Sequence, residues 1–458
     1  MKDLLKWVVF ITTILIFLYA FSSSYNSQNI DHLDYVIALC VDTVPDSDNL
    51  KVSFEFADLK SFSENSSSNS SEPIINTIVA PSISNAINVM NGYIGKQLNL
   101  SHCKLIVFSK DFAKRGVFNE VSVLANNVQI RPTASIVVSD MDASEYVKKS
   151  VSTLEQVLTK YYDLFPTSSK YTGYTSNIPL GKFYESIQEG DIGAVTILGK
   201  EVKNIKENTQ SSSSGEGQDT ASSSDKQSSG GQNSSSKPEE QCDDNTVEPN
   251  EIPKEVVEET SSENKPNYQS INPQFSIIEG DHGTENMGLT VFKDDKYVGD
   301  LTTIETLCYS LLEDEVDNFL VTLPSPFEDN QKIDIYAGSL SQLDVDVDIS
   351  GDVPKVNIYL NLTADVLSVL RHTNMSYEDS LEKINTCFKN YLSKEIKDFL
   401  YKTSREYKVD INEFYMIAKR KFWTIQDYQN YNWPEKYEKA EFNVNFNDTV
   451  ITTLIIKD

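Results

Sequence analysis

The sequence predicts a multi-domain protein of mixed helix and sheet, with an α/β domain, a disordered linker, an α+β domain and an amino-terminal membrane anchor. Three observations predict this class. Strand and helix patterns alternate over residues 31–203, a Ser-rich and then acidic segment fills 204–270, and strand patterns group around helices over 275–458. The predicted anchor or signal segment occupies residues 1–24. A chain of 458 residues is long enough for two or three domains with sizeable cores.

The charge balance argues against nucleic acid as a partner. The chain has 40 basic and 68 acidic residues and a formal net charge of −28. Proteins neutralise nucleic acid phosphates with Lys and Arg, so nucleic acid is not an expected partner. Much of the acidic excess lies in the predicted linker, which favours a solvated acidic surface over an acidic binding patch.

The five cysteines are dispersed, and no two of them form a CxxC pair. An odd, scattered set predicts neither a disulfide framework nor a zinc site. Four of them lie in apolar sequence, where a buried free thiol behaves as a small hydrophobic side chain. Those four are Cys40, Cys103, Cys308 and Cys387, and the fifth is Cys242 in the linker.

The amino-terminal segment predicts export of the rest of the chain. Leu4–Phe21 is apolar apart from one lysine and two threonines, and Lys2 and Lys6 lie on its amino-terminal side. A bilayer core of ~30 Å needs about 20 helical residues, so this length suffices for an anchor with a cytoplasmic amino terminus. A cleavable signal peptide is the alternative, because Ala20-Phe21-Ser22 resembles a small-x-small cleavage site.

The first folded region alternates strands with helices. Apolar runs predict strands at Leu33–Val41, Leu105–Phe108 and Ala134–Val138, and alternation of Val52, Phe54 and Phe56 with polar residues predicts a half-buried strand. Helical spacing predicts helices over Ile83–Leu98, around Phe112–Asn126, and after Asp142. This β-α-β-α-β-α order predicts parallel pairing with right-handed crossovers.

The linker has a composition that predicts disorder. Twelve serines fall within Ser211–Ser236, and ten acidic residues against one lysine follow within Glu239–Glu263. Such a segment cannot bury enough apolar surface to offset the entropy cost of ordering it. A solvated, self-repelling tether is therefore favoured over a binding tail.

The second folded region opens with a hairpin and a helix. Leu289 and Val291 predict one strand and Tyr297 a second, with a tight polar turn at 293–296 between them. Gly299 ends the second strand, where a bend or close backbone approach requires no side chain. Thr302 or Thr303 is then expected to cap a helix.

The remaining elements predict an α+β domain. Strands are expected at Phe319–Leu323, Lys332–Tyr336, Leu343–Asp348 and Val356–Leu362, and helices at Tyr377–Arg405 and Ile411–Phe422. Glu441–Phe446 and Val450–Ile456, separated by Asn447-Asp448, are expected to form a terminal hairpin.

Three segments of this sequence resemble the Ger(x)C family, the C subunits of spore germinant receptors. They are LDYVIALCVD at 33–42, YIGKQLNLSHCKLIVFSKDFAKRGV at 93–117, and GLTVFKDDKYVGDLTTIETL at 288–307. The resemblance implies a non-enzymatic subunit that acts in spore germination by assembly or signal coupling, without a cofactor. It also implies integral membrane A and B subunits as partners, and a place on the outer face of the spore inner membrane.

One feature departs from that family, whose members usually carry a lipid on a cysteine after the signal segment. Here no cysteine precedes Cys40, which belongs to a predicted strand, so no lipidation is expected. An exported, membrane-anchored solute-binding module or a cell-surface enzyme remains the alternative to the receptor subunit.

No residue is assigned a catalytic, cofactor-binding or metal-binding role. Ser101-His102-Cys103 would need a base and an orienting group beside a nucleophile, and no motif supplies them. Asp344, Asp346 and Asp348 share one strand face, but calcium loops need a turn with backbone ligands, so a solvated face is favoured. Phosphate-binding, hydrolase and zinc-protease motifs are absent.

Overall fold

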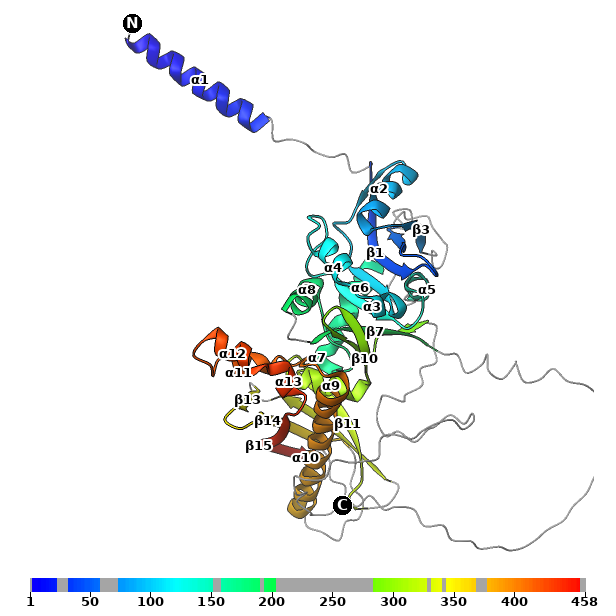
Figure 1. Ribbon diagram of the computed structural model, residues 1–458, viewed down its shortest axis with the longest axis vertical. Coiled ribbons are helices and arrows are strands. Elements are labelled where there is room, and N and C mark those ends of the chain that lie inside the picture. The colour runs from blue at the N-terminus through cyan, green and yellow to red at the C-terminus, as the bar shows by residue number, and fades with distance from the viewer. Residues whose placement is uncertain are drawn as a thin grey trace, which may run out of the picture.

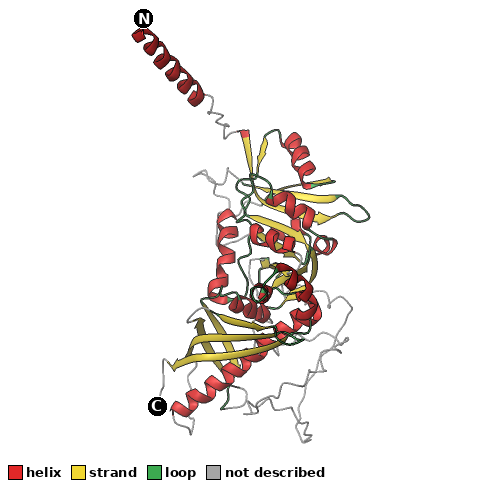
Figure 2. Cartoon of the chain, turned by 60° about the vertical axis from the view of Figure 1, so that its left-hand side comes forward, coloured by secondary structure: helices red, strands yellow, loops and turns green. Residues whose placement is uncertain are grey.

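The computed structural model describes residues 2–22, 32–57, 73–150, 158–189, 193–202, 283–327, 331–339, 343–367 and 377–453. Two sheets with helices packed on them form the body, which confirms the predicted mixed class (Figures 1 and 2). The predicted linker at 204–270, with Cys242, lies outside the described residues. The division of the chain into the predicted domains stays a prediction.

The first sheet is built around a parallel centre. Parallel pairing joins β1, β5, β6 and β7, which confirms the expected pairing. The full strand order is β10-β9-β7-β6-β5-β1-β2-β3. In addition, β4 pairs with β1 and β8 pairs with β7. Its strands are β1 (Leu33–Thr43), β2 (Leu50–Phe56), β3 (Ile74–Ala80), β4 (Gln97–Asn99), β5 (Leu105–Ser109), β6 (Ser135–Ser139), β7 (Gly193–Glu201), β8 (Thr284–Glu285), β9 (Leu289–Lys293) and β10 (Lys296–Leu301).

Helices cover both faces of this sheet, as the continuous apolar run of β1 requires. Leu39 and Val41 face one hydrophobic core and Ala38 and Cys40 face the other. The helices are α2 (Ile83–Ile94), α3 (Lys110–Arg115), α4 (Phe118–Ala125), α5 (Ala143–Lys149), α6 (Leu158–Leu164), α7 (Ser169–Thr172) and α8 (Leu180–Glu189), with a 3-10 turn η3 (Phe165–Ser168).

Three local predictions in this region are wrong. The helix expected over Ile83–Leu98 ends at Ile94, because Gly95 adopts the left-handed conformation with a φ of 70°, and Leu98 lies in β4. The single helix expected around Phe112–Asn126 is divided into α3 and α4 at Gly116, whose φ of 111° lies outside the helical range. Strand β2 is buried on both faces, not on one. Its Glu55 is 1% exposed, because α6 covers this face and the Tyr162 hydroxyl donates a 3.0 Å hydrogen bond to Glu55. Burial raises the pKa of Glu55 to about 8.

The second sheet has β14 at its centre. Along one edge of β14, its first half pairs with β13 and its second half with β12, and β12 pairs in turn with β11. Along the other edge of β14, β15 pairs in parallel. The strands are β11 (Asn318–Pro324), β12 (Lys332–Ser339), β13 (Asp344–Asp348), β14 (Lys355–Val366) and β15 (Glu441–Thr453).

The expected terminal hairpin is wrong, because β15 is one strand from Glu441 to Thr453. The register shifts between the pairs Leu360–Phe446 and Leu362–Thr449. The polar pair that suggested a turn, Asn447-Asp448, therefore lies in a bulge. Pairing along the whole of β14 outweighs the local turn propensity of these two residues.

Helices of the second region pack beside its sheet, and α10 lies along β15 (Figure 2). The elements are α9 (Thr303–Leu312), α10 (Tyr377–Tyr401), the π-helical turn η6 (Lys402–Tyr407), α11 (Phe414–Lys419), α12 (Ile425–Tyr431) and α13 (Trp433–Tyr437). The helix expected over 411–422 is shorter, since Glu413, with a φ of 56°, precedes the first helical residue of α11.

The amino-terminal segment forms helix α1 (Lys2–Ser22), and its large apolar side chains from Leu4 to Tyr19 are exposed. Within the described residues, no helix combines the length and the apolar character needed to cross a bilayer, and the anchor expected from the sequence is not shown.

Candidate functional site at the junction of the two sheets

The β9–β10 hairpin follows the predicted linker but completes the sheet that precedes it. Its two-residue turn is Asp294-Asp295, and Asp294 adopts the left-handed conformation with a φ of 56°, which aspartate tolerates better than most residues. Strand β9 pairs antiparallel with β7, and the buried hydroxyls of Thr196 and Thr290 are hydrogen-bonded across this pair. The two halves of the sequence therefore share one sheet.

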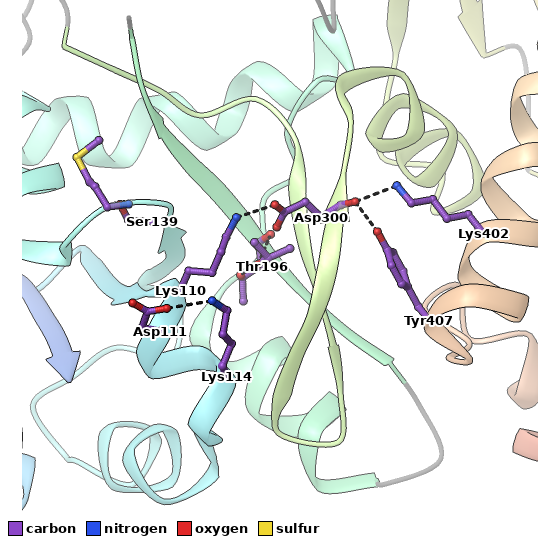
Figure 3. Close-up of polar contacts among 10 residues, drawn as sticks. Lys110, Asp111, Lys114, Ser139, Thr196, Asp300, Lys402 and Tyr407 are labelled. Carbon is purple, nitrogen blue, oxygen red and sulfur yellow. Dashed lines mark hydrogen bonds and ion pairs between the residues drawn. The ribbon is translucent and has the colours of Figure 1, made fainter. Parts of the chain in front are cut away.

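Asp300, on β10, connects three elements (Figure 3). Its carboxylate forms a 2.7 Å ion pair with Lys110 at the start of α3. Its carbonyl oxygen accepts hydrogen bonds from the Lys402 ammonium at 3.0 Å and the Tyr407 hydroxyl at 2.7 Å, both on η6. Asp300 thus links the first-sheet helix α3 to the end of the long helix α10.

Lys402 is held in this position by the cap of α9. Thr302 caps α9 in a capping box with Glu305, which confirms one of the two expected caps. The Glu305 carboxylate also accepts from Lys402 at 2.9 Å. Burial of the Lys402 ammonium disfavours its charge, but Glu305 and Tyr407 together outweigh that effect, so the pKa of Lys402 is raised.

Gly299 does not end its strand as expected, since β10 continues to Leu301, but it has the expected close backbone approach. A Cβ atom at this position would lie 2.4 Å from the Tyr407 ring, so only glycine fits without displacing that ring. The register of the hairpin also shifts between Tyr297 and Gly299, which places a bulge at this contact.

A second polar cluster joins α8 to the residues that follow α9. Lys182 lies 3.4 Å from both Glu313 and Glu315, and the Asn412 amide donates to Glu313 at 3.1 Å. The Ser176 hydroxyl donates to Glu315. Burial raises the pKa of Glu313 to about 7, although Lys182 and Asn412 act in the opposite direction.

A third contact places Asp410 against the start of β7. Its carbonyl oxygen accepts from the Gly193 amide at 3.1 Å. Its carboxylate accepts from the amides of Phe414 and Tyr415 at 3.2 and 2.8 Å, and from the Trp433 indole at 3.0 Å. Asp410 is 2% exposed, and burial raises its pKa to about 6.

The motif residues weighed in the sequence do not converge on a catalytic site. The His102 ring packs edge-on against Tyr35 with centroids 4.9 Å apart, and Ser101 is hydrogen-bonded to Asn99. Cys103 is buried, and burial raises its pKa to about 12, so it is held as a neutral thiol. Cys40, Cys308 and Cys387 are also buried, as expected.

The acidic strand face is solvated, as predicted. Asp344 and Asp346 are exposed on β13, and Lys421 forms a 2.6 Å ion pair with Asp346. Within the residues that the structure describes, no group of three or more His, Cys, Asp or Glu side chains is arranged to hold a metal.

An open cleft of about 480 Å³ lies where β1 ends, between the loop that follows it and α3. Its walls include Asp46, Asp48, Asp111 and Arg115. The guanidinium of Arg115 is 3.8 Å from Asp48, so the cation of this cleft is already paired with one of its carboxylates.

The pH dependence of stability tests the second cluster. The folded pKa of Glu313, about 7, exceeds an unfolded value near 4.3, so its stabilising contribution is present below about pH 4.3 and lost as pH rises through 7. As pH rises from 4.5 to 8, the unfolding free energy of Glu313→Gln is therefore expected to increase by roughly 1–3 kcal/mol relative to that of the unmodified chain. Urea unfolding at both pH values measures this difference. Glu382→Gln, an exposed position on α10, is the control, and an equal change in both variants would contradict the prediction.

Comparison with known proteins gives two family matches and a similarity to a solved structure. The model described as "Spore germination protein N-terminal domain" matches residues 26–200, and "Spore germination B3/ GerAC like, C-terminal" matches residues 287–453. The solved structure titled "Crystal Structure of the GerBC protein" is similar with 12% identity and a TM-score of 0.47, over 90% of this chain and 96% of that chain. The comparison with curated proteins gave no match.

Proposed function

Because the chain belongs to the Ger(x)C family of spore germinant receptor C subunits, we propose that it binds the integral membrane A and B subunits of a nutrient germinant receptor and catalyses no reaction. The family suggests association with the spore membrane. We place the body on the outer face of the spore inner membrane.

The observation that carries the coupling role is the shared first sheet. The hairpin at 289–301 belongs to the sequence after the predicted linker, yet it pairs with β7 from the sequence before it. Asp300, Lys182 and Asp410 add polar contacts between the same two parts. Partner contact on either part would therefore be transmitted to the other through a packed junction and not through a single tether.

A pull-down tests the assembly role. The tagged full-length chain, solubilised with detergent from spore membranes, is expected to recover an A-type and a B-type receptor subunit, identified by mass spectrometry. Recovery of the chain alone, with its amino terminus cut near Ser22, would overturn the proposal.

Germination assays test the biological role separately. Spores that lack this chain and any paralogues are expected to lose their response to at least one nutrient, and a normal response to every nutrient would contradict the role. The solute-binding alternative instead predicts a higher melting temperature of the purified chain with amino acids or sugars.

A further inference from the structure

One surface feature lies outside the junction, and we call it the aromatic tip. It consists of Met416 and Lys419 on α11, Arg420, and Trp423 and Ile425 where α12 begins. The Trp423 side chain is 99% exposed, Ile425 68% and Met416 42%. Helices α11 and α12 project sideways from the body (Figure 1).

The local fold holds Trp423 outward. Its neighbour Phe422 packs against the rings of Tyr428 and Tyr431, at centroid distances of 5.8 and 5.2 Å. On the other side, the Thr424 side chain caps α12 by accepting from the Asp427 amide at 3.1 Å. With Phe422 directed inward and Thr424 fixed as a cap, the Trp423 ring lies in solvent.

The charge around Trp423 is opposite to that of the whole chain. Lys419, Arg420 and Lys421 are consecutive and exposed in a chain of net charge −28. Lys421 is paired with Asp346 at 2.6 Å, and Asp427 is hydrogen-bonded to Thr424. Lys419 lies over the Tyr428 ring, 5.7 Å from its centroid. The hydrogen bond from the Thr424 hydroxyl leaves the Asp427 carboxylate charged, so Asp346 and Asp427 together offset two of the three basic side chains and one positive charge remains in excess.

We propose that the aromatic tip binds the surface of an anionic lipid bilayer. Tryptophan prefers the bilayer interface, where its ring is in the apolar layer and its N–H remains hydrated. Adjacent Lys and Arg side chains are attracted to anionic headgroups. A side chain on a projecting pair of helices can reach a soft interface, whereas a tryptophan that anchors a protein complex fills a packed pocket of its partner. These three features favour a bilayer over a protein as the occupant.

Fluorescence of the full-length chain tests this proposal at the site itself. Trp7→Phe leaves Trp423 and the buried Trp433 as the tryptophans, so changes in emission come from the exposed ring. Vesicles of phosphatidylglycerol and phosphatidylcholine, with brominated acyl chains, are expected to shift this emission to the blue and to quench it. Trp7→Phe/Trp423→Phe is expected to show neither change.

Charge reversal gives the matched comparison. With Lys419→Glu/Arg420→Glu, the lipid concentration that gives half of the maximal quenching is expected to rise at least tenfold. In the chain with an unmodified aromatic tip, 0.5 M salt is expected to weaken quenching as well. Lys293→Glu/Lys296→Glu makes the same charge change at an exposed turn elsewhere and is expected to have little effect. Unquenched Trp423 emission, equal quenching in both charge-reversed variants, or protection of Trp423 by a purified receptor subunit alone would overturn the proposal. None of these outcomes tests the receptor role, which depends on the pull-down.

Discussion

Replacing Gly299 with alanine is expected to lower the unfolding free energy by about 2–3 kcal/mol, the usual cost of forcing a methyl group into a packed site. The new Cβ would lie 2.4 Å from two atoms of the Tyr407 ring and 2.6 Å from its hydroxyl. That ring cannot move freely, because Tyr407 is mostly buried and its hydroxyl donates to the Asp300 carbonyl at 2.7 Å. The substitution would therefore displace η6 or β10 at the junction.

A matched glycine gives the control. Gly92 lies in helix α2, and a Cβ atom there would have no heavy atom within 4 Å. Gly92→Ala is expected to be neutral or to stabilise the chain by up to about 1 kcal/mol, since alanine favours a helix more than glycine. Urea unfolding of both variants measures the difference.

The contact with Tyr407 can be isolated with a double-mutant cycle. If the clash with the ring causes the loss, Gly299→Ala is expected to cost less than about 1 kcal/mol in a chain that already carries Tyr407→Ala. An unchanged cost in that background would show that backbone conformation, not the ring, explains the requirement for glycine. A loss of A- and B-subunit recovery with Gly299→Ala, but not with Gly92→Ala, would connect the junction to assembly.

Local signals in the sequence predicted much of the fold. The turn at Asp294-Asp295, the close approach at Gly299 and the cap at Thr302 each depend on residues within a few positions of one another. The apolar run of β1 likewise predicted a strand buried on both faces, because burial pattern follows directly from residue type and spacing.

The polar contacts of the junction had no such signal. Lys110 and Asp300 are 190 residues apart in the sequence, and Lys182 and Glu313 are 131 apart. A lysine or carboxylate at such positions is usually solvated, and only the folded chain determines which ones are brought together. The one local hint was Gly299, which directly precedes Asp300 and marks where another segment approaches the backbone.

The pattern of polar residues in β2 also failed to predict which face of the strand is buried. Alternation over 52–56 predicted a solvated face for β2, and Glu55 instead lies beneath α6 with Tyr162 as its partner. Helix α6 is more than a hundred residues further along the chain, so the period-two pattern contained no information about it.

Removing the carboxylate of Asp410 is expected to have the largest effect among these variants. Asp410→Ala would leave the amides of Phe414 and Tyr415 and the indole of Trp433 without their acceptor in a fully buried place. Each unsatisfied buried donor costs about 1–3 kcal/mol, so a total loss of roughly 3–5 kcal/mol of unfolding free energy is expected. Asp111→Ala, at an exposed position paired with Lys114, is the control and is expected to change stability by less than about 0.5 kcal/mol.

Substitution of Asp410 by asparagine separates the contribution of its hydrogen bonds to the unfolding free energy from the contribution of its charge. Asp410→Asn keeps one acceptor oxygen, so a smaller loss than with alanine is expected. The folded pKa of about 6 exceeds an unfolded value near 3.9, so the stabilising contribution of the Asp410 carboxyl is present below about pH 3.9 and lost as pH rises through 6. Urea unfolding from pH 4 to pH 8 is therefore expected to show the deficit of Asp410→Asn becoming smaller at higher pH. A deficit that grows with pH would mean that the three donors favour the charged carboxylate more than its burial disfavours it. In that case the carboxylate would support the junction through its charge, and Asp410 would act there as an anion held by Trp433 and the first amides of α11.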